Sequence, residues 1–151
     1  MQLAGALIKV GDRGSARPLL EQNREELTKQ LLLKAGNVPV LTALGVTLGM
    51  LDNRPEAKAA LDRADLLLQA ALTSPTARYT DRWELALARS WVDEKSVVLG
   101  EIGRLLREPS AQRLPNANVR VLRVSWATLP LHGDADFEAM LNDPRNNAPL
   151  F

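Results

Sequence analysis

The sequence has no cysteine and a single histidine among its 151 residues. Without cysteine the chain has no disulfide, no thiol nucleophile and no cysteine-bound zinc, and its redox compartment stays undecided. With one histidine, a metal site that needs two histidine ligands cannot form within one chain. We therefore expect no metal site and no cofactor.

Aromatic residues and long apolar runs are also scarce. Aromatic side chains make up 4% of the residues, so leucine and alanine must build the core. The longest apolar runs, such as residues 66–68, are far shorter than a membrane span. The opening MQLAGALIKVGDRG lacks the charged leader and long apolar stretch of a secretory signal. We expect no membrane contact by this segment and favour a cytoplasmic location.

Neither sign of charge dominates. The 19 basic and 18 acidic residues leave a formal net charge of +1, which disfavours nucleic-acid binding. Apolar residues make up 46% and charged residues 25%, as in ordinary globular domains, and the length suffices for a sizeable core. The composition therefore predicts one globular domain without a nucleic-acid partner.

Apolar residues recur at helical spacing along most of the chain, and strand-like alternation is scarce. Ser15 is predicted to cap a long helix with Pro18 in its first turn, Ser96 to cap the sixth helix, and Asp134 the last. A short helix is favoured over a strand at 119–126. The predicted helices cover residues 3–10, 16–35, 39–51, 55–72, 76–92, 96–109, 119–126 and 135–142, with a loop at 109–118 and an extended or disordered tail at 143–151.

A repeat of slightly more than forty residues runs through the chain. Each copy begins with a leucine and a small residue, at Leu3-Ala4, Leu44-Gly45 and Leu87-Ala88, and these leucines stand 41 and 43 residues apart. The spacing predicts hairpins of antiparallel helices that approach closely where small residues face each other. In the central copy these contact points are Gly45 and Ala57. In the third copy Gly100 takes the equivalent small position.

The central copy resembles a tetratricopeptide repeat (TPR). The residues that carry the resemblance are Leu41-x2-Leu44-Gly45-x2-Leu48 followed by Ala57-x3-Leu61-x2-Ala64. The small residues match the TPR signature, whereas leucines replace its aromatics and the period exceeds the usual length of about 34 residues. The third copy matches only through its first helix, because Arg104 stands where a leucine is expected.

This resemblance covers residues 1 to about 106 and implies an all-α fold. It implies three degenerate hairpins over residues 1–108, stacked as a short right-handed solenoid. A loop and capping helices at 109–142 and the tail at 143–151 complete a single domain.

The segment LRVSWATLPLHGDADFEAML (122–141) carries a second resemblance. It is similar to the closing segment of helical-repeat regions in bacterial multidomain signalling proteins, although Ala135 stands where proline is usual. Such regions follow serine/threonine kinase, adenylate cyclase or winged-helix DNA-binding domains. The resemblance implies that the chain is part of a longer protein with its effector domain upstream. The residues that fit the pattern are Pro130, Leu131, His132, Asp134 and Phe137.

No catalytic set emerges from the sequence. Gly11-x-x-Gly14 lacks the flanking strand and the lysine of a phosphate-binding loop. His132 lies in a turn and is predicted to be a structural surface residue. Among the tryptophans, Trp91 and Trp126 are predicted to pack in the core and Trp83 to be exposed. We expect no enzyme activity.

We expect instead a protein–protein interaction scaffold of TPR type that binds a peptide segment or a partner domain in a concave groove. Arginines at spacings of four and seven on the fifth helix could clamp a carboxylate, or could form only a solvated face. The alternative function is a ligand-sensing regulatory domain that controls an attached effector. A homo-oligomer is a further expectation. The predicted groove residues are Thr42, Val46, Met50, Arg82, Arg89 and Asp93.

Overall fold

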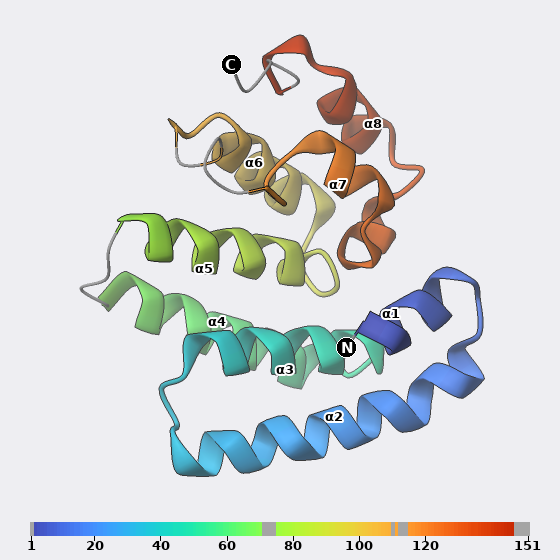
Figure 1. The fold of residues 1–151 in the computed structure, drawn as a ribbon, viewed down its shortest axis with the longest axis vertical. Coiled ribbons are helices and arrows are strands. Elements are labelled where there is room, and N and C mark those ends of the chain that lie inside the picture. Colours follow the sequence, from blue (N-terminus) through green and yellow to red (C-terminus); the bar gives the residue numbers. More distant parts are fainter. Residues whose placement is uncertain (1, 71–74, 110, 112–114, 147–151) are drawn as a thin grey trace. The chain divides into compact units, whose positions relative to one another are not determined.

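The computed structural model describes residues 2–70, 75–109, 111 and 115–146, the first three of the second range by their backbone only. All regular elements of this part of the chain are helices, which confirms the predicted all-α class (Figure 1). The chain divides into two compact units, Met1–Leu72 (unit 1) and Thr73–Phe151 (unit 2). The three hairpins predicted over residues 1–108 are thus distributed over both units.

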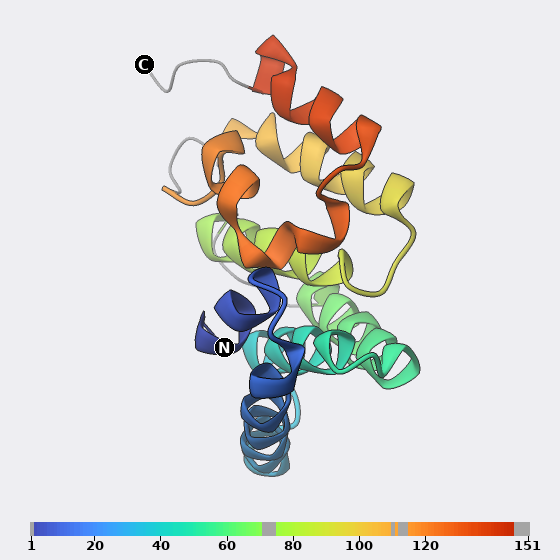
Figure 2. The same cartoon turned by 90° about the vertical axis from the view of Figure 1, so that its right-hand side faces the viewer.

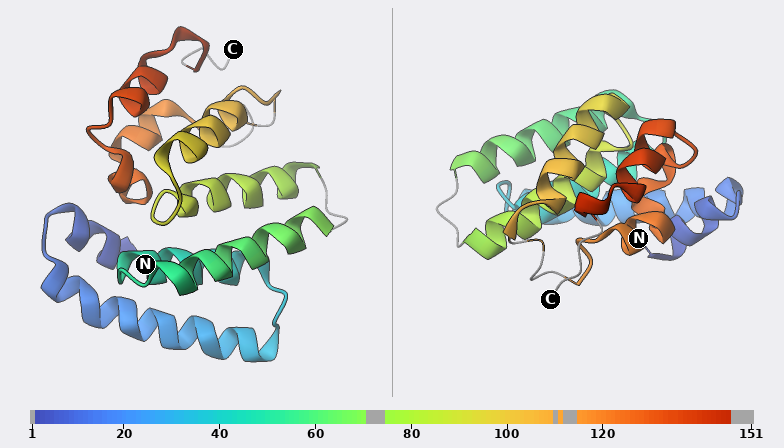
Figure 3. Two further views of the ribbon diagram at one scale, coloured as in Figure 1. Left: turned by 180° about the vertical axis from the view of Figure 1, so that it is seen from behind. Right: turned by 90° about the horizontal axis from the view of Figure 1, so that it is seen from above.

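Unit 1 consists of consecutive antiparallel helices. Each helix packs against the next one along the chain, and the contact between the third and the fourth is the most extensive. Figures 1 and 3 show α2 running alongside α3. Asn23 Nδ2 donates a hydrogen bond of 2.8 Å to the buried Thr47 Oγ1, which joins the first hairpin to the second. The helices are α1 (Gln2–Lys9), α2 (Arg13–Leu33), α3 (Val38–Met50) and α4 (Arg54–Ala70).

The turns after α1 and after α3 have the same backbone geometry. Gly11 (φ 84°) and Asp52 (φ 62°), which lie 41 residues apart, both adopt the left-handed conformation. Both turns follow the Schellman pattern of helix ends. The period found in the sequence is therefore present in the backbone of unit 1. The bonds that close the turns are Asp12 N–H to Leu7 O (2.9 Å) with Gly11 N–H to Ile8 O (3.0 Å), and Asn53 N–H to Leu48 O (2.9 Å) with Asp52 N–H to Gly49 O (3.1 Å).

The predicted caps at Ser15 and Ser96 are wrong. The N-cap of α2 is Asp12, whose carboxylate accepts a hydrogen bond of 3.0 Å from Ser15 N–H. Because the turn at Gly11 places Asp12 at the N-cap position, α2 begins at Arg13, three residues earlier than predicted. Pro18 therefore falls in the second turn of the helix. In unit 2, Ser96 lies inside the first turn of a helix whose N-cap, Glu94, makes no side-chain capping bond.

Unit 2 is built from one hairpin and the short helices that follow it. Its core cluster draws side chains from each α-helix of the unit and from the 3₁₀ helix η2 (Trp126–Leu131). In Figure 2, α8 lies beside α6, with which it is in contact. The short helix predicted at 119–126 is confirmed at Val119–Val124. The elements are α5 (Pro75–Arg89), α6 (Lys95–Leu106), α7 (Val119–Val124), the 3₁₀ helix η2 (Trp126–Leu131), α8 (Ala135–Asn142) and the 3₁₀ helix η3 (Pro144–Asn146).

Two expectations for the end of the chain have different outcomes. The N-cap at Asp134 is confirmed, because its carboxylate accepts hydrogen bonds from Asp136 N–H (3.1 Å) and Phe137 N–H (3.3 Å). The extended tail is wrong for η3, where Asn146 N–H donates to Asp143 O at 3.0 Å and closes a helical turn. The rest of the predicted tail, residues 147–151, lies outside the described residues.

The third copy of the repeat departs from the first two in its second helix. Gly100 is exposed, and a Cβ added to it would meet no atom within 4 Å, so it is not the helix contact that the repeat predicts. The face of α6 that packs in the core carries Val98, Ile102 and Leu105 instead. The repeat therefore continues into unit 2 only through its first helix, as the position of Arg104 in the sequence indicated.

Candidate functional site

The predicted groove residues of unit 1 share one face of α3. Thr42, Val46 and Met50 follow each other at intervals of four residues, which places them one above the other on a helix. All three side chains are buried, and among the described residues Thr42 Oγ1 has no hydrogen-bond partner. Met50 lines a hollow in unit 1, described below.

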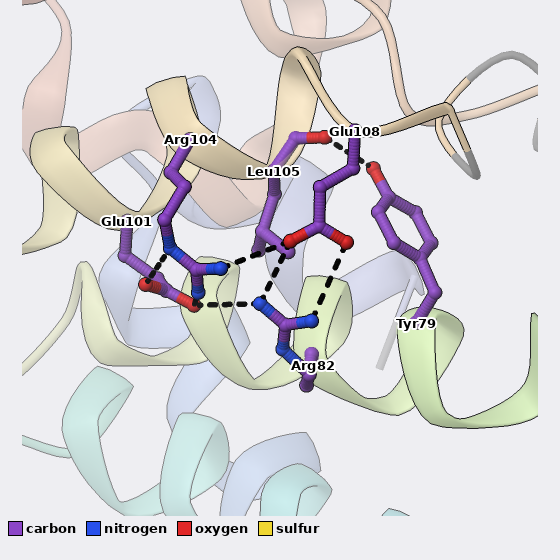
Figure 4. Close-up of polar contacts among 6 residues, drawn as sticks. All are labelled: Tyr79, Arg82, Glu101, Arg104, Leu105 and Glu108. Carbon is purple, nitrogen blue, oxygen red and sulfur yellow. Dashed lines mark hydrogen bonds and ion pairs between the residues drawn. The ribbon is translucent and has the colours of Figure 1, made fainter. Parts of the chain in front are cut away.

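The predicted groove residues of unit 2 are engaged with one another or with neighbouring carboxylates. Arg82 binds Glu108 through both ends of its guanidinium group, at 3.0 Å and 3.4 Å (Figure 4). Arg89 Nη1 binds Asp93 Oδ2 at 2.5 Å, one helical turn further along the chain. A partner carboxylate would therefore have to displace Glu108 or Asp93 to reach either arginine.

A four-residue charge network joins α5 to α6 and to the residues just after it. Arg104 binds Glu108 at 2.9 Å and Glu101 at 2.5 Å, and Arg82 lies 3.8 Å from Glu101. Two cations and two anions alternate in this network, so its formal charge sums to zero (Figure 4). Bidentate arginine–carboxylate pairs add geometric specificity to their attraction. The network fixes Arg82 against α6 and does not present a free cation.

Tyr79 lies beneath this network. Its side chain is 2% exposed, and its hydroxyl donates a hydrogen bond of 2.9 Å to the carbonyl oxygen of Leu105. Desolvation by burial raises the pKa of Tyr79 to about 12; the negative charge of Glu108 adds to this shift and the positive charge of Arg82 opposes it. The phenol therefore stays protonated in the folded chain at a pH where a free tyrosine ionises.

We expect an alkaline titration to show this shift directly. The folded chain binds the Tyr79 proton more tightly than the unfolded chain, whose tyrosine has a pKa of about 10. The group's contribution to the free energy of unfolding is therefore fully present below pH ~10 and decreases as the pH rises from about 10 to about 12. Because Tyr79 is the single tyrosine of the sequence, the ultraviolet absorbance of phenolate reports on it alone.

Two controls accompany this titration. The signal should disappear in Tyr79→Phe, and in concentrated urea its midpoint should return to about 10. A midpoint near 10 while circular dichroism still shows folded helices would contradict the buried, hydrogen-bonded phenol.

Unit 1 contains a hollow between its first hairpin and the turn after α3. Its volume is about 360 Å³, open mouth included. Its buried floor consists of Ala16, Leu20 and Met50. Its remaining lining residues are Ile8, Arg13, Arg17, Leu51 and Asp52.

The rim of this hollow carries two arginines and one aspartate. Arg13 Nη1 lies 3.2 Å from Asp52 Oδ2, and these two side chains are 63% and 80% exposed. Arg17 is exposed and has no ion pair or hydrogen bond with any residue that the structure describes. Sequence reasoning identified Met50 but missed the arginines, although Arg13, Arg17 and Leu20 stand at the spacing of a single helix face.

His132 has a structural setting in unit 2. Its Nε2 lies 3.3 Å from the hydroxyl oxygen of the buried Thr128, and its ring stacks on Phe137 with centroids 5.7 Å apart. Thr128 Oγ1 donates to the carbonyl oxygen of Leu122 at 2.7 Å, so the imidazole supplies the donor of the His132–Thr128 contact. The ring thus packs the turn after η2 against α8.

Metal-ligand clusters and membrane-spanning helices are both absent from the described part of the chain. No group of three or more histidine, cysteine, aspartate or glutamate side chains in residues 2–70, 75–109, 111 and 115–146 could hold a metal ion. Among the helices formed by these residues, none is both long and apolar enough to cross a bilayer.

In comparisons with known proteins, no family model, curated protein or solved structure matches the chain. The function therefore has to be argued from the chain's own helices and side chains.

Proposed function

We propose that the chain is a non-enzymatic protein–protein interaction scaffold of TPR type. The observation that carries this proposal is the 41-residue period of unit 1, which appears both in the sequence and in the two Schellman turns at Gly11 and Asp52. Stacked helical repeats present extended, ordered surfaces to partners. By the resemblance of residues 122–141, the setting is a bacterial signalling or regulatory protein.

The equivalent side chains of the two copies support the proposal because they are buried alike. Each copy places a small residue in its first helix and a small residue and a leucine in its second helix. All six residues are buried, so both copies use the same packing surface. They are Ala4, Ala16 and Leu20 in the first copy and Gly45, Ala57 and Leu61 in the second.

Exposed apolar residues at the end of α2 also support a role in binding. Leu32 and Leu33, which are consecutive in the sequence, are 82% and 89% exposed. A single exposed leucine is ordinary, whereas adjacent exposed apolar side chains add to the surface that a partner can cover. The ligand-sensing alternative is favoured by a different feature, the hollow of unit 1, which combines an apolar floor with charged groups.

Peptide selection set against a metabolite screen separates the two functions. Phage-displayed random peptides are selected on the full chain, and the enriched peptides are measured by fluorescence polarisation, with scrambled peptides as controls. In parallel, thermal unfolding is followed with a panel of small metabolites. We expect enriched peptides to bind with a shared pattern and no metabolite to raise the melting temperature. A stabilising metabolite without any enriched peptide would overturn the scaffold in favour of the sensor.

A further inference from the structure

The hollow of unit 1 has the size and openness of a socket for one side chain. Enclosed sites for small molecules measure about 300–1,000 Å³ and cover most of their ligand. This hollow reaches about 360 Å³ only when its open mouth is included. It can therefore hold an aliphatic side chain that enters from a segment lying across its mouth, whereas a metabolite bound there would stay largely open to solvent.

The floor of the hollow is apolar and comes from two repeats. Ala16 and Leu20 belong to α2 of the first copy, and Met50 ends α3 of the second. These three side chains are at most 4% exposed, so their positions are fixed by packing on their far side. A methionine adapts its shape to an incoming apolar group more readily than other core residues do. Because the floor itself is nearly covered, the apolar surface that an incoming side chain can contact comes mainly from the half-buried Ile8 and Leu51 beside it.

The charges at the rim favour an acidic ligand. Two arginines, Arg13 and Arg17, line the hollow together with a single acidic residue, Asp52. The Arg13–Asp52 pair is exposed, and such pairs are worth about 0–1 kcal/mol. Arg17 has no partner within the described residues, so its guanidinium can bind a carboxylate from outside in the bidentate manner typical of arginine.

The backbone at Asp52 adds a second observation to the rim. The equivalent position of the first copy is Gly11, which adopts the left-handed conformation without steric cost. Asp52 adopts the same conformation, which costs about 1 kcal/mol of steric strain because its Cβ approaches the following carbonyl oxygen. In exchange, its carboxylate holds Arg13 at the rim. The turn thus places a carboxylate at the position where the first copy has no side chain.

We propose that this hollow docks an acidic segment of a partner protein. One leucine-sized side chain of the segment lies against the half-buried Ile8 and Leu51 at the opening above the floor, and a neighbouring aspartate or glutamate carboxylate binds Arg17. This inference rests on the proposed scaffold function and names the chemistry of the partner that the scaffold would recognise.

Methyl NMR on the full chain tests this docking. The probe is a short capped peptide with a Glu-Leu-Glu core in a glycine–serine background, and the protein carries labelled isoleucine and methionine methyl groups. Ile8 and Met50 line the hollow, whereas Ile102 and Met140 of unit 2 serve as reference signals. We expect saturable shifts at Ile8 and Met50 only, with an affinity that falls as salt is raised.

Matched variants and peptides define the contributions of charge and apolar surface. Arg17→Glu should weaken binding at least tenfold, while Arg63→Glu, the same charge reversal at an exposed position of α4, should leave it unchanged. Peptides with Lys-Leu-Lys or Glu-Ser-Glu cores should not shift Ile8 or Met50. Circular dichroism of both variants checks that the helices remain folded.

Three results would overturn the docking site: no shift at Ile8 and Met50, an equal response to the Lys-Leu-Lys peptide, or unchanged affinity in Arg17→Glu. If the Glu-Ser-Glu peptide shifted the signals as much as Glu-Leu-Glu does, the leucine side chain would not contribute to binding. This result would also overturn the proposal. If peptides selected from the random library bind but shift other signals, the scaffold function stands and this site falls. If no peptide of any kind binds, both fall.

Discussion

Replacing Trp83 by alanine is expected to lower the free energy of unfolding by about 3–5 kcal/mol, the range found when a fully buried aromatic side chain is truncated. Trp83 is 0% exposed and belongs to the core cluster of unit 2, together with Ile102, Leu105 and Phe137. These residues come from three helices, so the cavity left by the indole cannot close by the shift of one side chain alone. The loss therefore combines lost burial with a residual cavity.

The indole nitrogen of Trp83 makes a second variant informative. Nε1 is buried and has no hydrogen-bond partner among the described residues, and an unsatisfied buried donor costs about 1–3 kcal/mol. Trp83→Phe removes this donor while keeping an aromatic ring in the core. We expect a smaller loss than for alanine, on the order of 1–2 kcal/mol, because relief of the donor offsets part of the cavity cost.

Urea denaturation followed by circular dichroism measures both losses, and hydrogen exchange locates them. Protection should decrease most in α6 and α8, which share the cluster with Trp83. The control is Trp126→Ala, because Trp126 is only half-buried and lies outside the cluster, so it should lose less. A loss below about 0.5 kcal/mol for Trp83→Ala, within the range of ordinary surface substitutions, would show that the side chain is not part of the core.

The helices and the repeat could be predicted from the sequence because local rules determine them. Pro55 at the start of α4, Asp134 before α8 and the leucine spacing of α3 act within one or two helical turns. The 41-residue period survives in the structure because the same residue types pack at Ala16 and Ala57, which are both buried.

The packed face of α5 could not be predicted, since apolar residues occupy more than one side of this helix. Tyr79, Trp83 and Leu87 face the core cluster, and Leu85 and Ala88 are buried as well. Tyr79, Trp83 and Leu87 share one face at intervals of four residues, whereas Leu85 and Ala88 lie on another, so helical periodicity alone does not tell which apolar face packs in the core cluster. The sequence places Trp83 next to Arg82, which favoured an exposed position that the structure contradicts.

The environment of the candidate site depends on contacts between distant residues. Glu108 follows Arg82 by 26 positions in the sequence and neutralises its charge in the fold. Asp52 follows Arg13 by 39 positions and forms an ion pair with it. No local pattern indicates either pair, whereas the Arg89–Asp93 pair has the spacing of helix neighbours. The arginines on α5 were therefore predicted as a cationic stripe, and the rim of the hollow in unit 1 was missed.

The second large effect is expected at Gly45, where α3 packs tightly against α4. A Cβ at this position would lie 2.5 Å from Leu61 Cγ, closer still to Leu61 Cδ2, and 3.3 Å from the carbonyl oxygen of Ala57. Leu61 is 0% exposed, so its side chain cannot turn out into solvent to make room. Overpacking of this kind costs about 1–3 kcal/mol, and it is opposed by a gain of roughly 1 kcal/mol from placing alanine in a helix. We expect Gly45→Ala to lose up to about 2 kcal/mol net.

Gly100→Ala is the matched control for this substitution. Gly100 also lies inside a helix, but an added Cβ there meets no atom within 4 Å. The helix preference then acts alone, and the variant should gain up to about 1 kcal/mol. The same chemical change is thus expected to have opposite signs at the two positions, which urea denaturation resolves. A stabilising Gly45→Ala would contradict the close approach of the two helices.

A double-mutant cycle attributes the loss at Gly45 to Leu61. Leu61→Ala alone should cost about 2–5 kcal/mol, because it leaves a cavity between α3 and α4. In the double variant, the alanine methyl at position 45 enters space that the leucine has vacated. The sum of the stability losses of the two single variants should therefore exceed the loss of the double variant. A coupling of about 1–2 kcal/mol in this direction is expected for residues in direct contact. Additive losses would instead mean that the glycine is required for its backbone and not for the space that it leaves to Leu61.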